Sequence, residues 1–330
     1  MLEQKKLNEL NKNDKIKHYL LLTKLDVKST KNGKQYLDLE LRDASVILNA
    51  KMWSNFENFL QTAKEGNVVK VLGALDEFNN QPQIKIEQIR NITEEDNVSI
   101  DDFLPKSQRT IVEMENEFND ILLSIKNTYL KELLDKIFTK DNFDKYKRAP
   151  AGKAWHHAYI GGLLEHTLEI IKICDLMCNI HSDADRDLLI TGAILHDFGK
   201  IEELEFTSAF DYTDKGKLLG HIVIVANIIE KTAGQIDDFP EELKIQVMHL
   251  VLSHQGKLEY ASPVTPKTLE AIILYQADEL SAKTNAYKSA INAEKNNDVS
   301  WTRYLPLAET SLYIPKQQKD TGDDFKETLF

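Results

Sequence analysis

The chain has 330 residues, of which 42% are hydrophobic and 28% are charged, with only 13 glycines and 8 prolines. This composition excludes disordered, collagen-like and low-complexity proteins, and the length corresponds to two or three domains of about 150 residues. The N-terminal sequence lacks the apolar segment of a signal peptide, and no apolar stretch reaches the roughly 18 residues of a membrane span. Two cysteines cannot form a disulfide framework. We therefore expect a cytoplasmic protein with no membrane partner.

The net charge of −12 is distributed unevenly along the chain. Residues 15–92 contain 12 lysines and arginines against 9 aspartates and glutamates, which gives +3. Residues 1–14 are neutral, so residues 93–330 carry −15. A mildly basic part joined to a strongly acidic part indicates two modules with different functions.

Residues 15–92 show mainly the two-residue period of β-strands, after a short N-terminal extension over 1–14. The pattern predicts strands over 15–30, 35–43, 45–53, 67–78 and 81–92, with the last two joined by a hairpin through Asn79 and Asn80. A helix over 55–66, capped by Ser54 or Asn55 and ended by Gly66, is predicted after the third strand. This order is that of a five-stranded OB-like β-barrel, a fold that binds single-stranded nucleic acid. Other small all-β domains share the order without that function.

Several side chains of this module could contact a nucleic-acid strand by stacking on bases or pairing with phosphates. Tyr36 and Arg42 are the strongest candidates, because they share the polar face of one predicted strand. Lys51 and Trp53 on the next strand complete the candidate strand-binding set. Any one of these aromatic residues is also typical of a barrel core or surface, and a charge of +3 predicts modest affinity.

The remainder of the chain is predicted to be helical. Residues 93–106 are acidic and lack periodicity, which predicts a linker, and residues 298–330 form a less regular C-terminal segment. Between them, over 107–297, apolar residues recur every three or four positions, which predicts an all-α bundle. The predicted helices cover 111–127, 129–138, 159–178, 185–198, 217–233, 241–254 and 266–287. The fold class is therefore multidomain α and β, with the barrel followed by the helical bundle.

Eight of the nine histidines lie in this helical part, and His196 is followed directly by Asp197. The pair stands at the predicted end of a helix, just before Gly199, a residue type that commonly ends helices. An imidazole and a carboxylate at such a bend can both reach one metal ion. The motifs HExxH, GxSxG and GxGxxG are absent, and Ile201 stands where a phosphate-binding loop needs Ser or Thr.

The segments LLEHTLEII, ILHDFGK, LLGHIVIV, VLSHQG and LYQADELSAK together resemble the HD-domain metal-dependent phosphohydrolases. More narrowly, OB-like strands followed by HHAYIGGLLEHT, HDFGKIEEL and SPVTPKTLEAIILYQADELSAK resemble the YhaM family of 3′→5′ exoribonucleases over nearly the whole chain. The resemblance implies a set of metal ligands: His166, His196, Asp197, His221, His254 and Asp278. It also implies that Lys200 lies near the substrate phosphate, and that His156 and His157 lie near the substrate.

Four imidazoles and two carboxylates are more ligands than one tetrahedral zinc ion needs. They suit two octahedral divalent ions that share Asp197, with Mn²⁺ expected first and Fe²⁺, Mg²⁺ or Co²⁺ as alternatives. Two such ions can activate a water molecule and stabilise the charge at a phosphoryl centre. A cation at Lys200 would neutralise charge on the phosphate oxygens, so Asp197 and Lys200 are the catalytic candidates.

The other histidines carry weaker signals. If one regular helix joined His157 to His166, nine residues apart, the two side chains would lie on opposite faces and need not bind one metal ion. Packing at the start of a helix is an equal alternative for His156 and His157. His249 lies five residues before His254, about 140° around a helix, and is predicted to be structural.

These patterns predict a metal-dependent nuclease that acts on single-stranded RNA, or DNA. The resemblance alone implies that it is an exonuclease, that it proceeds 3′→5′ and that it releases nucleoside monophosphates. One alternative is an HD-domain nucleotidase or phosphodiesterase acting on small nucleotides, against which the attached barrel argues. No HHERxDGxGYP-type segment follows His254, which argues against the cyclic-dinucleotide branch. The other alternative is a non-catalytic single-strand-binding protein, against which the complete ligand set argues. A homo-oligomer and the preference between RNA and DNA stay open.

Overall fold

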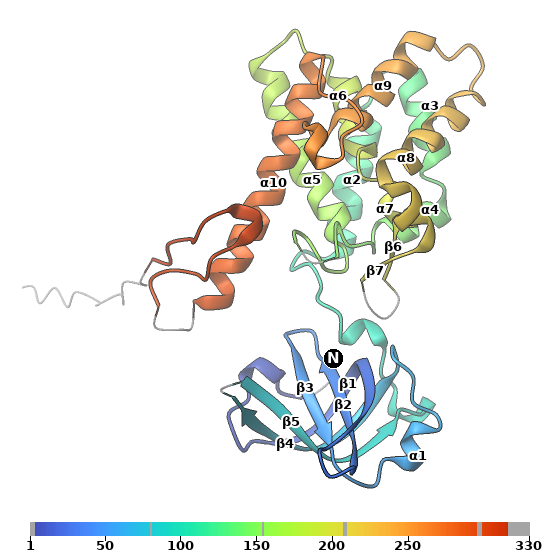
Figure 1. Cartoon of the computed structure of the whole chain (residues 1–330). Coiled ribbons are helices and arrows are strands. Elements are labelled where there is room, and N and C mark those ends of the chain that lie inside the picture. The colour runs from blue at the N-terminus through green and yellow to red at the C-terminus, as the bar shows by residue number, and fades with distance from the viewer. Residues whose placement is uncertain (1–3, 80, 154, 207–209, 296–298, 316–330) are drawn as a thin grey trace, which may run out of the picture.

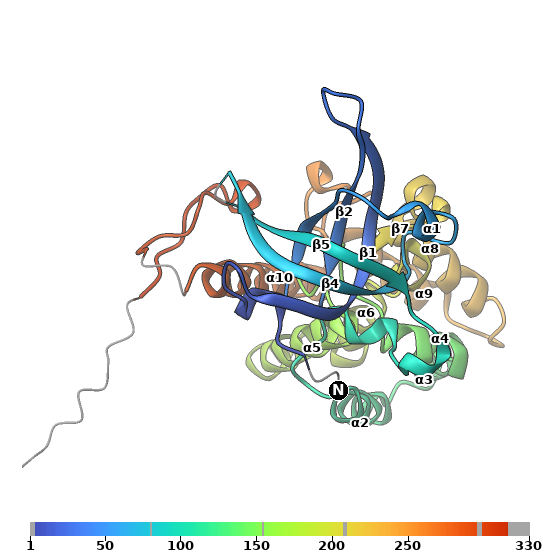
Figure 2. The same cartoon turned by 90° about the horizontal axis from the view of Figure 1, so that it is seen from below.

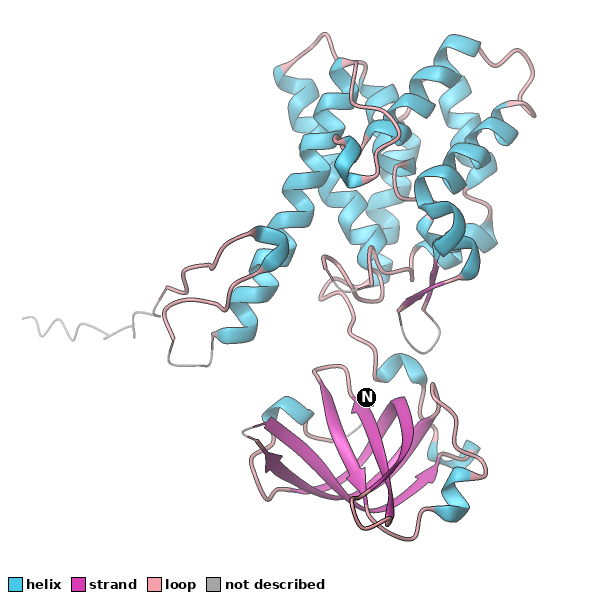
Figure 3. Ribbon diagram, in the orientation of Figure 1, coloured by secondary structure: helices cyan, strands magenta, loops and turns pink. Residues whose placement is uncertain are grey.

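The computed structural model describes residues 4–79, 81–153, 155–206, 210–295 and 299–315. A β-barrel formed by the N-terminal part lies beneath a bundle of helices (Figure 1). Coloured by secondary structure, the chain separates into a strand-rich part and a helical part (Figure 3). The predicted fold class is therefore confirmed.

The barrel closes in the strand order β1-β2-β3-β5-β4, in which only β3 and β5 run parallel. Alternation along β2 places Leu37, Leu39 and Leu41 in the barrel core and leaves the intervening side chains partly exposed. Asn80, which the sequence places in the last hairpin, lies outside the described residues. The strands are β1 (Lys15–Ser29), β2 (Gln35–Arg42), β3 (Ile47–Met52), β4 (Val68–Phe78) and β5 (Gln81–Asn91).

The helix predicted after the third strand is wrong in extent and in its cap. The structure forms only the single turn α1 (Glu57–Leu60), and neither Ser54 nor Asn55 caps it. Asn55 adopts the left-handed conformation, with φ of 60°, which stops a helix from starting there. At the other end the Gly66 N–H donates to the Leu22 carbonyl at 2.8 Å, so the chain turns back onto β1 instead of continuing helically.

Within the described ranges, the helical part contains the seven predicted helices and two shorter ones, α4 and α7, which the apolar spacing did not reveal. Its core is built mainly from α5 and α6, many of whose side chains are fully buried, and the other long helices pack around these two. The helices are α2 (Ile111–Ser124), α3 (Thr128–Ile137), α4 (Lys140–Tyr146), α5 (Gly162–Ile180), α6 (Arg186–Leu195), α7 (Lys200–Glu203), α8 (Asp214–Ala233), α9 (Glu241–Ser253) and α10 (Leu269–Glu294). A small hairpin, β6 (Leu204–Glu205) and β7 (Asp211–Tyr212), follows α7.

A separate hydrophobic cluster joins the barrel to the helices. The segment over 93–106 forms two 3-10 turns and buries Phe103 and Leu104 almost completely. These two side chains pack between residues of the barrel and residues of the helical part. The buried members of this joint cluster are Leu21, Val68, Phe103, Leu104, Ile160 and Phe210. The barrel and the helices therefore share buried apolar surface, which fixes one against the other.

The end of α10 extends beyond the rest of the bundle and carries the C-terminal segment with it (Figures 1 and 2). Residues 299–315 fold back on themselves through a bridge between Trp301 and Tyr313, and Ile314 is buried. Seen from below, the barrel covers the underside of the helices and leaves this projection free at one side (Figure 2). Across the described ranges, no helix is both long and apolar enough to cross a membrane.

Candidate functional site

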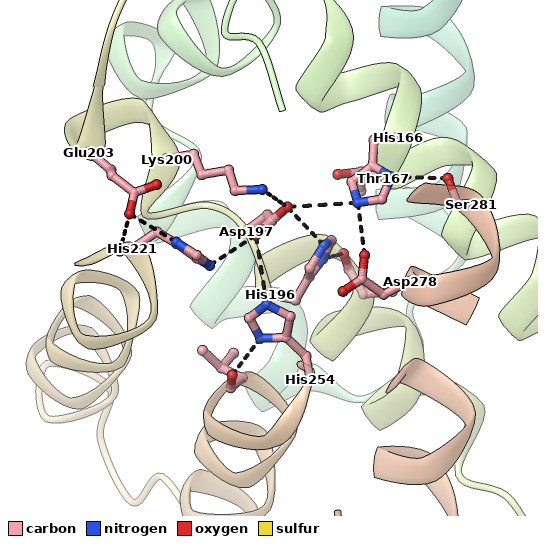
Figure 4. A network of polar contacts seen from close by, with 12 residues as sticks. His166, Thr167, His196, Asp197, Lys200, Glu203, His221, His254, Asp278 and Ser281 are labelled. Carbon is pink, nitrogen blue, oxygen red and sulfur yellow. Dashed lines mark hydrogen bonds and ion pairs between the residues drawn. The ribbon is translucent and has the colours of Figure 1, made fainter. Parts of the chain in front are cut away.

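The six predicted metal ligands converge at the centre of the helical part, although they come from five separate helices (Figure 4). His166 lies on α5, His221 on α8 and Asp278 on α10. His196 and Asp197 directly follow α6, and His254 caps α9. All six side chains are largely shielded from solvent.

Asp197 lies in the middle of this cluster, and its two oxygens face two different pairs of histidines (Figure 4). Its Oδ2 atom lies 3.2 Å from His196 Nε2 and 3.7 Å from His166 Nε2. Its Oδ1 atom lies 3.3 Å from His221 Nε2 and 3.8 Å from His254 Nε2. Among the described residues, two groups of potential ligand atoms that lie within 4.8 Å of one another share Asp197, and a third such group consists of His156, His157 and His166.

Asp278 and Lys200 complete the immediate surroundings of Asp197. Asp278 Oδ1 lies 3.0 Å from His166 Nε2 and therefore beside the group formed by His166, His196 and Asp197. Lys200 Nζ donates to Asp197 Oδ2 at 2.6 Å and is itself buried. Lys200 thus lies beside the ligands, in reach of any phosphate that approaches them.

The outer nitrogen of each histidine ligand is held by a hydrogen bond, which turns the inner nitrogen toward Asp197. The Nδ1 atoms of His196 and His254 lie 2.8 and 2.6 Å from backbone carbonyl oxygens three residues earlier. His221 Nδ1 donates to Glu203 Oε1 at 3.0 Å. His166 Nδ1 donates to the Ser281 hydroxyl at 3.0 Å, since that hydroxyl uses its own hydrogen for Glu169. This is the arrangement of a histidine prepared to bind metal through Nε2.

The inner Nε2 atoms of His166, His196 and His221 are buried and have no hydrogen-bond partner. Each of these nitrogens faces a carboxylate oxygen at 3.0 to 3.3 Å without a hydrogen bond. This is unfavourable, because the buried nitrogen has lost its hydrogen bond with water. Imidazole nitrogens together with carboxylate oxygens are the donors that octahedral first-row divalent ions accept. The residues present therefore fit divalent metal ions.

Electrostatics in the cluster mostly favour the ligand forms. Burial would raise the pKa of Asp197, but Lys200 and His196 outweigh it and hold the pKa well below its usual range. Burial and then His196 lower the pKa of His254 to about 4, and burial also lowers the pKa of His166 well below its ordinary value. His196 is the exception, because Asp197 outweighs burial and raises its pKa. An ionised carboxylate and neutral imidazoles are the states that bind metal.

Two glycines allow the backbone to bring His221 into the cluster. Gly220 interrupts α8 with φ of 71° and ψ of 154°, a left-handed region that glycine tolerates, and this kink turns His221 inward. Gly199 is not the left-handed helix end that the sequence predicts, since its φ is −58°. Glycine is needed there because a Cβ atom would lie 2.2 Å from the His221 carbonyl oxygen.

His156 and His157 lie against the Asp197 cluster, on a loop that is longer than the sequence predicts. The predicted helix from 159 is wrong at its start, because Gly161 takes φ of 83° and α5 begins at Gly162. The helical spacing that separated His157 from His166 therefore does not apply. Their ring centroids are 5.0 Å apart, and those of His156 and His166 are 4.8 Å apart. His249 faces elsewhere, as expected, and accepts from the Lys267 N–H.

On the barrel, the structure brings three of the four candidate strand-binding residues together. Tyr36 and Trp53 stack with ring centroids 4.6 Å apart, and the Lys51 ammonium lies 5.4 Å and 5.9 Å from their centroids. Phe78 of β4 joins them 5.3 Å from the same ammonium and is 57% exposed. Arg42 lies at the other end of β2, where burial lowers its pKa, and so is not part of this stacking face.

The sequence did not single out Glu203, Ser281 or Phe78. Glu203 stands in the quoted segment HDFGKIEEL, yet only the fold shows that it holds His221. Ser281 follows Asp278 by three residues, and this one-turn spacing on a helix is a usable signal. No sequence pattern indicates Phe78, because β4 comes near the Lys51 end of β3 only when the barrel has formed, with β5 between the two strands.

Comparison with known proteins agrees with both parts of this architecture. The HD domain family model matches residues 163–283, and the OB-fold nucleic acid binding domain model matches residues 25–92. The 3′-5′ exoribonuclease YhaM of Bacillus subtilis (strain 168) is 32% identical over 306 residues, covering 93% of this chain and 96% of that protein. YhaM of Bacillus pumilus (strain SAFR-032) is 34% identical, covering 86% and 90%. YhaM of Listeria monocytogenes serotype 4b (strain F2365) is 33% identical, covering 89% and 94%.

The fold and the site define a protein in which an OB-fold barrel is joined to an HD-domain phosphohydrolase, a class that depends on divalent metal. Within that class, the chain belongs to the family of YhaM 3′-5′ exoribonucleases.

Proposed function

We propose that this chain is a metal-dependent 3′→5′ exoribonuclease that hydrolyses single-stranded RNA to nucleoside monophosphates. The observation that carries the proposal is the cluster around Asp197, where buried, unpaired Nε2 atoms surround a carboxylate whose pKa is held low. The family membership supplies the polymer substrate and the polarity. Residues 15–92 would hold the strand and residues 107–297 would cleave it.

Two metal ions fit the division of ligands around Asp197. One would be held by His166, His196 and Asp278 together with Asp197, and the other by His221 and His254 together with the same Asp197. We expect Mn²⁺, with Fe²⁺, Mg²⁺ or Co²⁺ as alternatives, because the donors are nitrogen and oxygen without sulfur. When bound, such a pair supplies Lewis-acid stabilisation and activates water for attack on phosphorus.

The protein's own residues contribute binding and charge. Lys200 Nζ stands 2.6 Å from Asp197 and would neutralise negative charge on the phosphoryl oxygens during cleavage. On the barrel, the stacked pair Tyr36 and Trp53 offers a flat face to bases, while Lys51 offers a positive charge to the backbone. Stacking accepts any base, which suits an enzyme that proceeds along a strand of any sequence, RNA or DNA.

The test is a 5′-labelled single-stranded oligoribonucleotide incubated with the protein and Mn²⁺. We expect a ladder that shortens from the 3′ end, and its loss in Asp197→Ala. Asp237→Ala removes an exposed aspartate between α8 and α9 and serves as the matched control. Cleavage of mononucleotides without RNA degradation would instead identify a nucleotidase, and binding without cleavage would identify a non-catalytic strand-binding protein.

We place the enzyme in the cytoplasm. Both cysteines, Cys174 and Cys178, are free thiols. Unpaired thiols are the normal state in that reducing compartment.

A further inference from the structure

Two cavities open onto the metal centre and share one wall, formed by Trp155 and His156. The first, of about 370 Å³, reaches Lys200 and His221, and we name it the hairpin cavity because β6 and β7 bound it. The second, of about 230 Å³, reaches His254 and Asp278, and we name it the α9–α10 cavity because these helices and their connection line it. Each cavity therefore meets a different side of the Asp197 cluster.

The two cavities differ in their relation to the barrel. Leu204 and Tyr212 of the hairpin line the first one, and the hairpin extends from the bundle toward the barrel (Figure 1). A nucleic-acid strand held on the barrel would therefore approach the metal centre through the hairpin cavity. The α9–α10 cavity lies across the wall of Trp155 and His156. The end of a strand that passes the centre would reach it.

The α9–α10 cavity has the dimensions and side chains of a nucleoside site. Its volume is small for a ligand pocket and suits one nucleoside. Besides Trp155, it is lined by the rings of Tyr260 and Tyr275, and base stacking on aromatic rings is strong and independent of base identity. The Lys257 ammonium lies 5.0 Å from the ring of Tyr260, one of the lining residues.

Gln255 supplies a polar atom that lacks a partner in this cavity. Its Oε1 atom is buried and accepts no hydrogen bond. The following Gly256 adopts φ of 76°, and its N–H donates to the Ser253 carbonyl at 2.8 Å. A Cβ atom at Gly256 would stand 2.2 Å from the Tyr275 ring, so the ring presses directly on this turn. The backbone at Gln255 is therefore fixed, and its buried Oε1 atom can accept a hydrogen bond from a ligand.

Resting on the proposed function, we infer that the α9–α10 cavity binds the 3′-terminal nucleoside of the strand, and that Gln255 Oε1 accepts a hydrogen bond from a hydroxyl of its sugar. An enzyme that tolerates every base cannot depend on base edges, and a sugar hydroxyl is the donor that all four terminal nucleotides share. With one nucleoside in this cavity, the first internucleotide phosphate lies at the Asp197 cluster. Gln255 is thus a specificity-determining residue that recognises the end of the chain.

The experiment compares three 5′-fluorescein-labelled hexauridylates that end in uridine, 2′-deoxyuridine or 3′-deoxyuridine. For the Mn²⁺-loaded full-length protein we expect kcat/KM for removal of the last nucleotide to be about 10- to 100-fold higher with uridine than with at least one deoxy end. The deoxy substrate that is cleaved slowly shows which hydroxyl of the last sugar, 2′ or 3′, donates to Gln255. In Gln255→Leu the preference should fall below about threefold. Gln276→Leu, at an exposed glutamine of α10, is the matched control and should keep it.

Equal cleavage of all three ends by the unaltered protein, or an unchanged preference in Gln255→Leu, would overturn the inference. The preference compares substrates on one protein, so any loss of metal or stability caused by the substitution cancels. Fluorescence anisotropy in the Asp197→Asn background measures binding of the same oligonucleotides without cleavage and should show the same order of affinity. If no RNA is cleaved at all, the proposed function fails, while this binding order still decides the inference.

Discussion

Glu203 orients His221, and replacing it with glutamine tests whether the orientation of a ligand matters separately from its identity. Glu203 Oε1 accepts from both the backbone N–H and Nδ1 of His221, each at 3.0 Å. Burial would raise the pKa of Glu203, but its hydrogen bond with His221 outweighs burial and lowers it, so the group is ionised at pH 7. Glu203→Gln keeps the size of the side chain and removes the charge that fixes the proton on Nδ1.

The expected magnitude follows from these two contacts. A hydrogen bond to a charged group contributes about 1.5–3 kcal/mol, and replacing the charged acceptor by a neutral one removes part of that amount. Removal of such an outer partner typically weakens metal binding by about 10- to 100-fold. We therefore expect the Mn²⁺ concentration for half-maximal activity to rise by about 10- to 100-fold, with kcat at saturating Mn²⁺ largely restored.

The assay is a Mn²⁺ titration of RNA cleavage, paired with calorimetric titration of the metal-free protein. Glu202→Gln is the matched control, because Glu202 is the neighbouring residue, is only half-buried and pairs with Lys215 instead of a metal ligand. An unchanged Mn²⁺ affinity in Glu203→Gln would refute the argument. So would an activity loss that excess Mn²⁺ does not restore, since that result would assign Glu203 a role other than orienting a metal ligand.

Three other substitutions test separate parts of the molecule. Trp53→Ala should weaken binding of single-stranded RNA by about 1–3 kcal/mol, the contribution of one stacked base, measured by fluorescence anisotropy at fixed salt. Gly199→Ala should disrupt the metal centre and destabilise the protein by more than about 2 kcal/mol, measured by urea unfolding, because its Cβ would collide with the His221 carbonyl oxygen. Lys172 and Arg109 outweigh burial and lower the pKa of Glu117, so its ion pairs stabilise the protein above the unfolded pKa of about 4.3 and are lost as the pH falls through the lower folded value. Glu117→Gln should accordingly lower the free energy of unfolding by less than about 1 kcal/mol at pH 7, and the difference should vanish in acid.

Each of these has a control and a contrary outcome. Trp301→Ala removes an exposed tryptophan of the C-terminal segment and should leave RNA affinity unchanged, whereas equal losses in both variants would deny the barrel face its role. Gly234→Ala meets only contacts of 3.5 Å or more and should be tolerated. Full activity in Gly199→Ala would show that the close approach is not needed. A stability difference for Glu117→Gln that persists at acid pH would rule out the ion pairs as its cause.

The barrel was predictable because its hydrophobic residues follow the geometry of a strand. Leu37, Leu39 and Leu41 are all buried, as their alternation indicates. The positions that failed are those where tertiary contacts override local preference. The chain around Gly66 turns back to hydrogen-bond with Leu22, which no local pattern in residues 55–66 encodes.

The ligand set was predictable from the order of its motifs, but its geometry was not. His196 and Asp197 are adjacent in sequence, whereas Asp278 reaches them only through the packing of α10 on α5 and α6. His157 illustrates the limit of helical spacing, since the glycine pair at 161–162 was itself a turn signal that the apolar period obscured. The contact between Glu203 and His221 depends on the two-residue strand β6 and on the kink in α8. Neither feature can be recognised from a single segment of the sequence.

The joint cluster of Phe103 and Leu104 has a consequence for the length of the products. Because it fixes the barrel against the helices, the path from the stacking face to the Asp197 cluster has one set contour. If the proposed function holds, an RNA longer than that path would contact the barrel and the Asp197 cluster together, whereas a shorter one would contact the helical part alone. Degradation should therefore slow abruptly at a particular length of the remaining RNA. Substitutions that weaken the joint cluster should make this change in rate more gradual. The hydrophobic contact between the barrel and the helices would in this way set the length of RNA that both parts can hold.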